Sequence, residues 1–164
     1  MVELPVIKRL RKEMENLKRE LTIDLPKELE RARAHGDLSE NAEYAMAKQR
    51  QEFLRARLSN YELRVAELAR INLESVPRDT VGLGSKVEIE DEEGARTEYE
   101  IVVPEEVDAT LNRISLASPL GKAMIGRGEG DDFEVQTPKG KRAYSVVRLH
   151  TIHDLLESNG SRES

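Results

Sequence analysis

The first half of the chain carries apolar side chains at the spacing of a coiled coil. Successive members are three or four residues apart, first in one stretch and again in a second stretch farther along. The two sets are Ile7, Leu10, Met14, Leu17 and Leu21, and then Leu54, Leu58, Tyr61, Val65 and Leu68. This spacing predicts two long helices, each with one narrow apolar face.

A hairpin explains both sets together. In an antiparallel pair the two faces meet in matched layers, which are Leu21 with Leu54, Leu17 with Leu58, Met14 with Tyr61, Leu10 with Val65, and Ile7 with Leu68. The bend then falls near residues 37–38, beside Gly36, the only glycine in the first 81 residues. We therefore predict an antiparallel coiled-coil hairpin over residues 1–74, with its tip at 35–44. A parallel dimeric coiled coil is the alternative.

Pro26 interrupts the first predicted helix. Proline lacks a backbone N–H, and its ring collides with the preceding turn of a helix. We therefore expect either a kink at Pro26 or a break at which Asp24 caps a new helix.

Beyond residue 74 the pattern changes to the alternation that is typical of strands. Residues 75–84 contain Pro77, Gly82 and Gly84 and are predicted to be a linker. A short helix is predicted at 118–126, with Ser118 as its N-cap. Strands are predicted at 86–90, 97–103, 112–116, 132–136 and 142–149.

These elements predict an α+β fold class, in which the hairpin precedes a small antiparallel domain over residues 85–156. The polar stretch 157–164 is predicted to be a disordered tail.

Composition and charge narrow the possible functions. The chain has no cysteine, which excludes disulfides and thiolate metal sites. No apolar run reaches the roughly 20 residues that a membrane span needs, so we expect a cytoplasmic protein without a membrane partner. The net charge of −6 argues against general binding to nucleic acid, which requires a basic surface. It leaves room for binding to a basic site on another protein.

The predicted tip carries three carboxylates at a spacing of three residues, Asp37, Glu40 and Glu43. One interpretation is structural, because Asp37 and Glu40 have the spacing of a helix capping box. The other is functional, because paired carboxylates are hard oxygen ligands of the kind that hold Mg²⁺. Two ligands are too few for a tight site. The pair therefore makes most sense if a rod of roughly 50 Å delivers it into the site of another protein.

The residues of the tip also resemble a known family. Residues 32–44, followed by Ala47 and Lys48, closely resemble the tip of the bacterial Gre transcript-cleavage factors, those of the GreA type in particular. A second resemblance lies in the other half of the chain, at residues 112–116, 118–126, 130–132 and 137–140. The resemblance covers most of the chain.

The resemblance implies that the hairpin enters the secondary channel of bacterial RNA polymerase. Asp37 and Glu40 would there help to hold a catalytic Mg²⁺ of the polymerase, which then cleaves the 3′ end of a backtracked transcript. The isolated protein would carry no cofactor, would be a monomer and would not itself be an enzyme. Its C-terminal domain would have an FKBP-like fold and dock on the rim of the channel.

The resemblance also implies roles for residues around the carboxylate pair. Arg33 and Lys48 match basic positions near the 3′ end of the nascent RNA. Asn41, Glu43 and Tyr44 would support the tip or contact the polymerase.

Two other functions remain open from the sequence. A channel-binding inhibitor would occupy the polymerase without cleavage, and a coiled-coil adaptor with an inert tip would not bind polymerase. A stand-alone metallonuclease is disfavoured, because His35, His150 and His153 do not have metal-ligand spacing. We interpret His150 and His153 as surface or packing residues at the end of the last strand.

Overall fold

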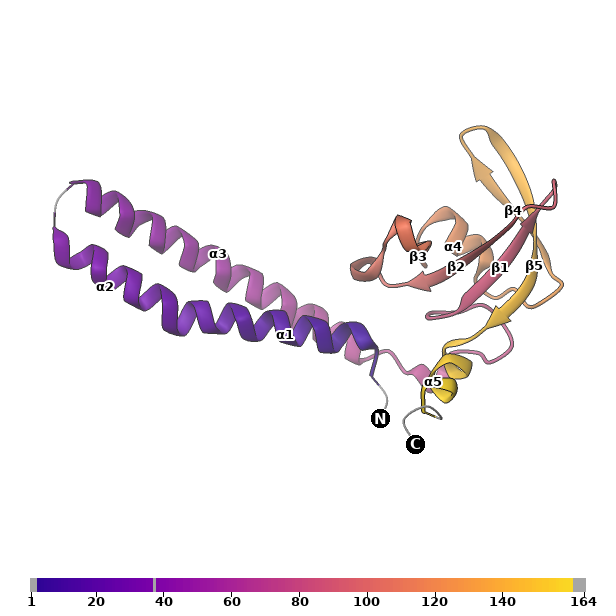
Figure 1. The fold of residues 1–164 in the computed structure, drawn as a ribbon, viewed down its shortest axis with the longest axis horizontal. Coiled ribbons are helices and arrows are strands. Elements are labelled where there is room, and N and C mark those ends of the chain that lie inside the picture. The colour runs from indigo at the N-terminus through magenta and orange to yellow at the C-terminus, as the bar shows by residue number, and fades with distance from the viewer. Residues whose placement is uncertain (1–2, 37, 161–164) are drawn as a thin grey trace. The chain divides into compact units, whose positions relative to one another are not determined.

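The computed structural model describes residues 3–36 and 38–160, without the side chains of residues 35, 38–41, 159 and 160. The chain divides into two compact units, Met1–Ile71 and Asn72–Ser164. Figure 1 shows the first as a pair of long helices and the second as a curled sheet with short helices. Each unit is described below by itself.

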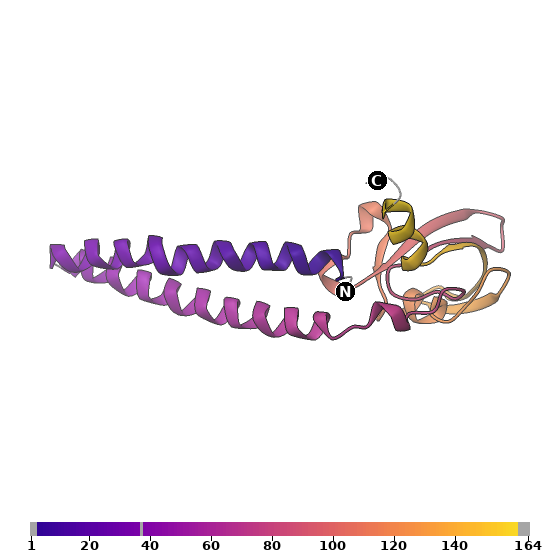
Figure 2. The same cartoon turned by 90° about the horizontal axis from the view of Figure 1, so that it is seen from below.

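The first unit is the predicted antiparallel hairpin. One arm is built from α1 (Pro5–Arg19), a π-helical turn, η1 (Glu20–Asp24), and α2 (Leu25–His35), and the other arm is α3 (Leu38–Ala69). The two arms run side by side in both views (Figures 1 and 2). With a rise of 1.5 Å per residue, α3 is a rod of roughly 50 Å.

The first arm passes Pro26 without a break, so the predicted cap at Asp24 is wrong. Asp24 has helical backbone angles, and its side chain makes no capping hydrogen bond. The N–H of Leu25 donates instead to the carbonyl of Glu20, five residues back, which is the π-helical pattern. This wider turn lies directly before Pro26, where an α-helix would lack one donor, and it keeps the arm continuous.

The arms meet along a narrow apolar stripe. Leu25, Ala47 and Leu54 form a buried cluster, against which Leu17, Leu21 and Leu29 pack from the first arm. Toward the open end of the hairpin the buried seam residues are Ile7, Leu10, Val65 and Leu68. An ion pair also links the arms, with Arg50 Nε 3.1 Å from Glu20 Oε1. The stability of the hairpin therefore depends on few side chains.

The second unit is a five-stranded sheet in the order β3-β2-β1-β5-β4. Its strands are β1 (Lys86–Asp91), β2 (Arg96–Val102), β3 (Arg113–Ser115), β4 (Asp132–Thr137) and β5 (Gly140–His150). Neighbours are antiparallel as predicted, except that β3 is parallel to β2. The sheet is therefore mixed. Between β2 and β3 the chain passes through two short 3₁₀ turns, η3 (Pro104–Glu106) and η4 (Ala109–Leu111), which allow this crossover.

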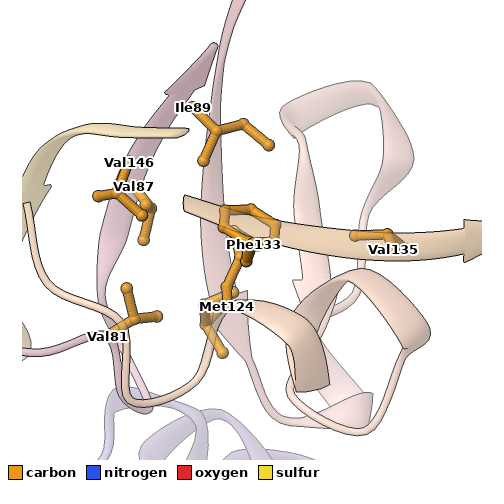
Figure 3. Close-up of a cluster of buried hydrophobic side chains, with 8 residues drawn as sticks. Val81, Val87, Ile89, Met124, Phe133, Val135 and Val146 are labelled. Carbon is orange, nitrogen blue, oxygen red and sulfur yellow. The ribbon is translucent and has the colours of Figure 1, made fainter. Parts of the chain in front are cut away.

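The short helix of this unit begins as predicted. In α4 (Pro119–Met124), Ser118 Oγ accepts a hydrogen bond from the N–H of Gly121 at 3.1 Å. Met124 then projects into the core, where its side chain is fully buried. Figure 3 shows it beside Phe133, among aliphatic side chains from several strands. The buried cluster comprises Val81, Val87, Ile89, Ile101, Met124, Phe133, Val135 and Val146.

The described part of the chain ends in a helix that the sequence did not predict, α5 (Ile152–Gly160). The predicted disordered tail is therefore wrong for residues 157–160, and residues 161–164 lie outside the described part. The N–H and hydroxyl of Thr151 both donate to Asp154 Oδ2, at 2.9 and 3.2 Å. This is half of a capping box, which stabilises the first turn. Over the described residues, no helix is both long and apolar enough to cross a membrane.

Candidate functional site

A two-residue connection joins the arms at the tip of the hairpin. Helix α2 ends at His35, and Gly36 follows in the left-handed conformation, with φ of 75°. A Cβ on Gly36 would meet no atom within 4 Å, so glycine is favoured here for its backbone freedom and not for lack of space. Helix α3 begins two residues later, at Leu38. The backbone reversal thus falls where the matched layers predicted it.

The two residues predicted to associate with the metal, Asp37 and Glu40, belong to this part of the sequence. Asp37 is outside the described residues. Glu40 and Asn41 belong to the first turns of α3, but their side chains are not described. The structure therefore places the backbone of Glu40 near the N-terminal end of α3, a position that suits either a capping or a metal-binding carboxylate.

Three of the other predicted tip residues come together one to three turns below the connection. Arg33 Nη2 donates to the phenol oxygen of Tyr44 at 3.3 Å, which joins α2 to α3. The Arg33 guanidinium carbon lies 5.8 Å from the centre of the Tyr44 ring, and Lys48 Nζ lies 5.9 Å from it. A cation this close to an aromatic face is attracted to it. Arg33, Tyr44 and Lys48 therefore form a basic cluster around an aromatic ring, which we call the subtip cluster.

The subtip cluster changes the acidity of its tyrosine. The hydrogen bond from Arg33 lowers the pKa of the Tyr44 phenol, and the charges of Lys48 and Arg33 act in the same direction. Desolvation opposes them without reversing the direction. The pKa is lowered because hydrogen-bond donors and nearby cations stabilise the phenolate relative to the neutral phenol.

This account predicts the effect of Arg33→Leu on the titration of Tyr44. The substitution removes the donor and one of the two cations, so the pKa of Tyr44 should rise toward that of an ordinary tyrosine. The measurement is a pH titration of the tyrosine ring resonances by NMR. An unchanged Tyr44 pKa in the variant would show that Arg33 does not bond to the phenol in solution.

Glu43 takes a different place from the subtip cluster. It lines a hollow of about 480 Å³ together with Glu28, Arg31, Ala32, Met46, Ala47 and Arg50. Met46 is 70% exposed here. The sequence analysis did not predict this hollow or the ion pair between Glu20 and Arg50 that bridges the arms. The matched layers place Glu20 opposite Arg55, so the sequence held no direct signal for its pairing with Arg50.

The two histidines whose side chains are described, His150 and His153, lie in the second unit. His150 lies at the end of β5, paired with Lys86 of β1. His153 is buried in α5, not at the end of the strand, and its Nε2 lies 2.7 Å from the carbonyl oxygen of Val76. Within the described part of the chain, no group of three or more His, Asp or Glu side chains is arranged to hold a metal.

Comparison with known proteins accounts for nearly the whole chain. Residues 6–70 match the family model described as transcription elongation factor, N-terminal. Residues 76–151 match the model described as transcription elongation factor, GreA/GreB, C-terminal. The chain belongs to the GreA/GreB family. The two matches correspond to the two structural units in order.

Individual members of the family are similar over most of their length. The transcription elongation factor GreA of Syntrophus aciditrophicus is 42% identical over 92% of this chain and 96% of its own. GreA of Nitratidesulfovibrio vulgaris strain DP4 is 41% identical over 88% of this chain and 89% of its own. Among solved structures, GreA factor homolog 1 of Thermus thermophilus is 34% identical over 88% of this chain and 94% of its own, with a TM-score of 0.40.

Proposed function

We propose that this transcription elongation factor inserts its hairpin tip into the secondary channel of bacterial RNA polymerase and stimulates cleavage of backtracked RNA. The observation that carries the proposal is the position of Asp37 and Glu40. In the sequence, Asp37 stands between α2 and α3 of a hairpin that matches the GreA/GreB family, and Glu40 belongs to the first turn of α3. A carboxylate pair at the end of a thin rod can reach a recessed site that a globular domain cannot.

The donor set fits a shared Mg²⁺. Carboxylate oxygens are the ligands that Mg²⁺ prefers, and a pair leaves most of its coordination shell to water and phosphate oxygens. Within the polymerase, Asp37 and Glu40 would contribute their charge and oxygen atoms to that site. In that site one metal ion would activate water, and the other would stabilise charge on the leaving oxygen of the phosphodiester. The factor is therefore a contributor to the active site of another protein and not an enzyme alone.

Other contacts of the hairpin are consistent with a role in carrying the tip carboxylates into the polymerase. The bond between Arg33 and Tyr44 joins the arms directly below the connection, which limits how far the arms can separate there. The subtip cluster also presents two cations and an aromatic face, chemistry that suits the phosphates and bases at the RNA 3′ end. Asn41 and Glu43 would contact the polymerase beside it. The C-terminal unit, with its FKBP-like sheet, would dock at the rim of the channel.

The proposal is tested with backtracked elongation complexes assembled from purified bacterial RNA polymerase. The factor with Mg²⁺ should shorten the RNA from its 3′ end well above the intrinsic rate of the polymerase. Binding without shortening would contradict the proposal and indicate an inhibitor of the same channel. An absence of binding would indicate an adaptor with an inert tip.

A prediction for the isolated protein concerns its affinity for Mg²⁺. Two carboxylates supply too few ligands to replace the hydration shell of the ion, so binding should be weak, with Kd in the millimolar range or above. Isothermal titration calorimetry of the free protein measures this directly. A tight stoichiometric site in the free protein would contradict delivery of the carboxylates to a shared ion.

A further inference from the structure

The C-terminal helix α5 contacts the loop through which the chain joins the sheet of the second unit. This loop spans residues 76–84, between η2 (Leu73–Ser75) and β1. The GreA/GreB match ends at residue 151, so α5 lies beyond the segment that the family model describes. Its contacts are therefore a feature of this chain that the family description does not cover.

The first two residues of α5 contact the two ends of the loop. Ile152 packs on Gly84, where an added Cβ would lie 2.7 Å from Ile152 Cδ1. The left-handed φ of 82° at Gly84 and this close approach both require glycine. His153 reaches the other end, with its Nε2 2.7 Å from the carbonyl oxygen of Val76. A carbonyl can only accept, so the Nε2 of His153 carries the proton and donates.

The hydrogen bond of His153 is buried, so its loss should cost more free energy than the loss of an exposed contact. The His153 side chain is only 8% exposed. When one partner of a buried hydrogen bond is removed, water cannot reach the group that remains. That group is left unsatisfied, which costs more than the loss of a contact at the surface. The nearby ion pair between Arg78 and Glu157 is different, because both side chains are 69% exposed. Exposed pairs of this kind contribute little.

The far end of the loop is held without α5, but the near end is not held in the same way. The N–H of Val81 donates to the carbonyl of Arg127, and the N–H of Gly84 donates to the carbonyl of Ile101 in β2, so this end is bonded to the body of the second unit. At the near end, the described backbone bonds are local ones within η2, such as that from Val76 N–H to the Leu73 carbonyl. Leu73 is buried, and the Val76 side chain lies against Gly82. His153 supplies the buried hydrogen bond that ties this end to α5.

We propose that α5 is a C-terminal clasp that closes the 76–84 loop and so fixes the point at which the chain joins the second unit. Ile152 packs on the loop at Gly84, and His153 hydrogen-bonds to the loop at Val76. The capping contact between Thr151 and Asp154 keeps the first turn of α5 formed independently of the loop. The clasp goes beyond the proposed function and does not depend on it.

The test is hydrogen–deuterium exchange of the full-length protein, read at the amides of Glu74, Ser75 and Val76. Their N–H groups are bonded within η2, so they report whether this end of the loop is held. His153→Leu removes the donor and keeps apolar bulk, and exchange at these amides should become about fivefold faster, the factor for one net hydrogen bond. His153→Gln keeps an N–H near the same position and should remain close to the unsubstituted protein.

Arg78→Gln is the matched control, because it removes the exposed ion pair between the same loop and helix. It should leave exchange at the three amides unchanged. If His153→Leu does not fold, His153→Asn replaces it, because its shorter amide does not reach Val76. The clasp is overturned by unchanged exchange at these amides, by an equal increase throughout the strands, or by an equal effect of Arg78→Gln.

Discussion

Asp37→Asn and Glu40→Gln should each retain the fold and polymerase binding but lose stimulated RNA cleavage by roughly 10²-fold. The size is that expected when one preorganised electrostatic contact to a transition state is removed. Asparagine caps a helix about as well as aspartate, and glutamine keeps the reach of a capping box. Both substitutions therefore preserve the structural role of the residue and remove only its negative charge.

Melting temperature, competition for polymerase and RNA shortening are measured on the same two proteins. Glu28→Gln is the control, because Glu28 is an acidic residue of the hairpin that lines the hollow on its side and has no proposed contact with the polymerase. It should retain most of the activity. If Asp37→Asn cleaves at the normal rate, then Asp37 acts as a helix cap and its assignment to the metal is wrong.

Leu54→Asp should unfold the hairpin while the sheet of the second unit stays folded. Leu54 is 1% exposed and belongs to the cluster that joins the arms. The substitution loses the buried methyl groups and places a carboxylate among leucines, at a combined cost of about 4 kcal/mol or more. A hairpin with so narrow a seam does not have other contacts that would offset this loss.

Circular dichroism measures the helical signal, which should fall strongly in this variant. NMR of the strand amides shows whether the sheet stays folded. Leu63→Asp is the control on the same helix, since Leu63 is 66% exposed. It should leave the helical signal nearly unchanged. Equal effects of the two substitutions would mean that the seam does not stabilise the hairpin.

The sequence predicted those parts of the fold that depend on periodic burial. The three-and-four spacing of the seam residues led to the hairpin, and alternation led to each of the five strands within a few residues. Ser118 and Pro119 marked the start of α4 because capping is local. Such features can be predicted from the sequence because a few neighbouring residues determine them.

Other features depend on partners far away in the chain. The parallel pairing of β3 with β2 follows from the path of the intervening turns, which has no periodic signal. The polar residues 157–160 resemble a disordered tail, and the contacts of α5 with the 76–84 loop, through Ile152 and His153, join residues about 70 positions apart in the sequence, which no local pattern shows. The functional role of the carboxylate pair was predicted from a short motif and a family resemblance, because acidic residues alone have no distinctive periodic pattern.

The π-helical turn η1 gives the first arm a place where its length can change. A π-helical turn contains about one residue more than an α-helical turn. Deleting one residue between Glu20 and Asp24 would convert the turn to ordinary α-helix and leave the helices on either side in phase. The same deletion in the middle of α3 would rotate everything beyond it by about 100° and turn the tip away from its facing arm. Insertions and deletions among related hairpins should therefore accumulate at this turn rather than in α3.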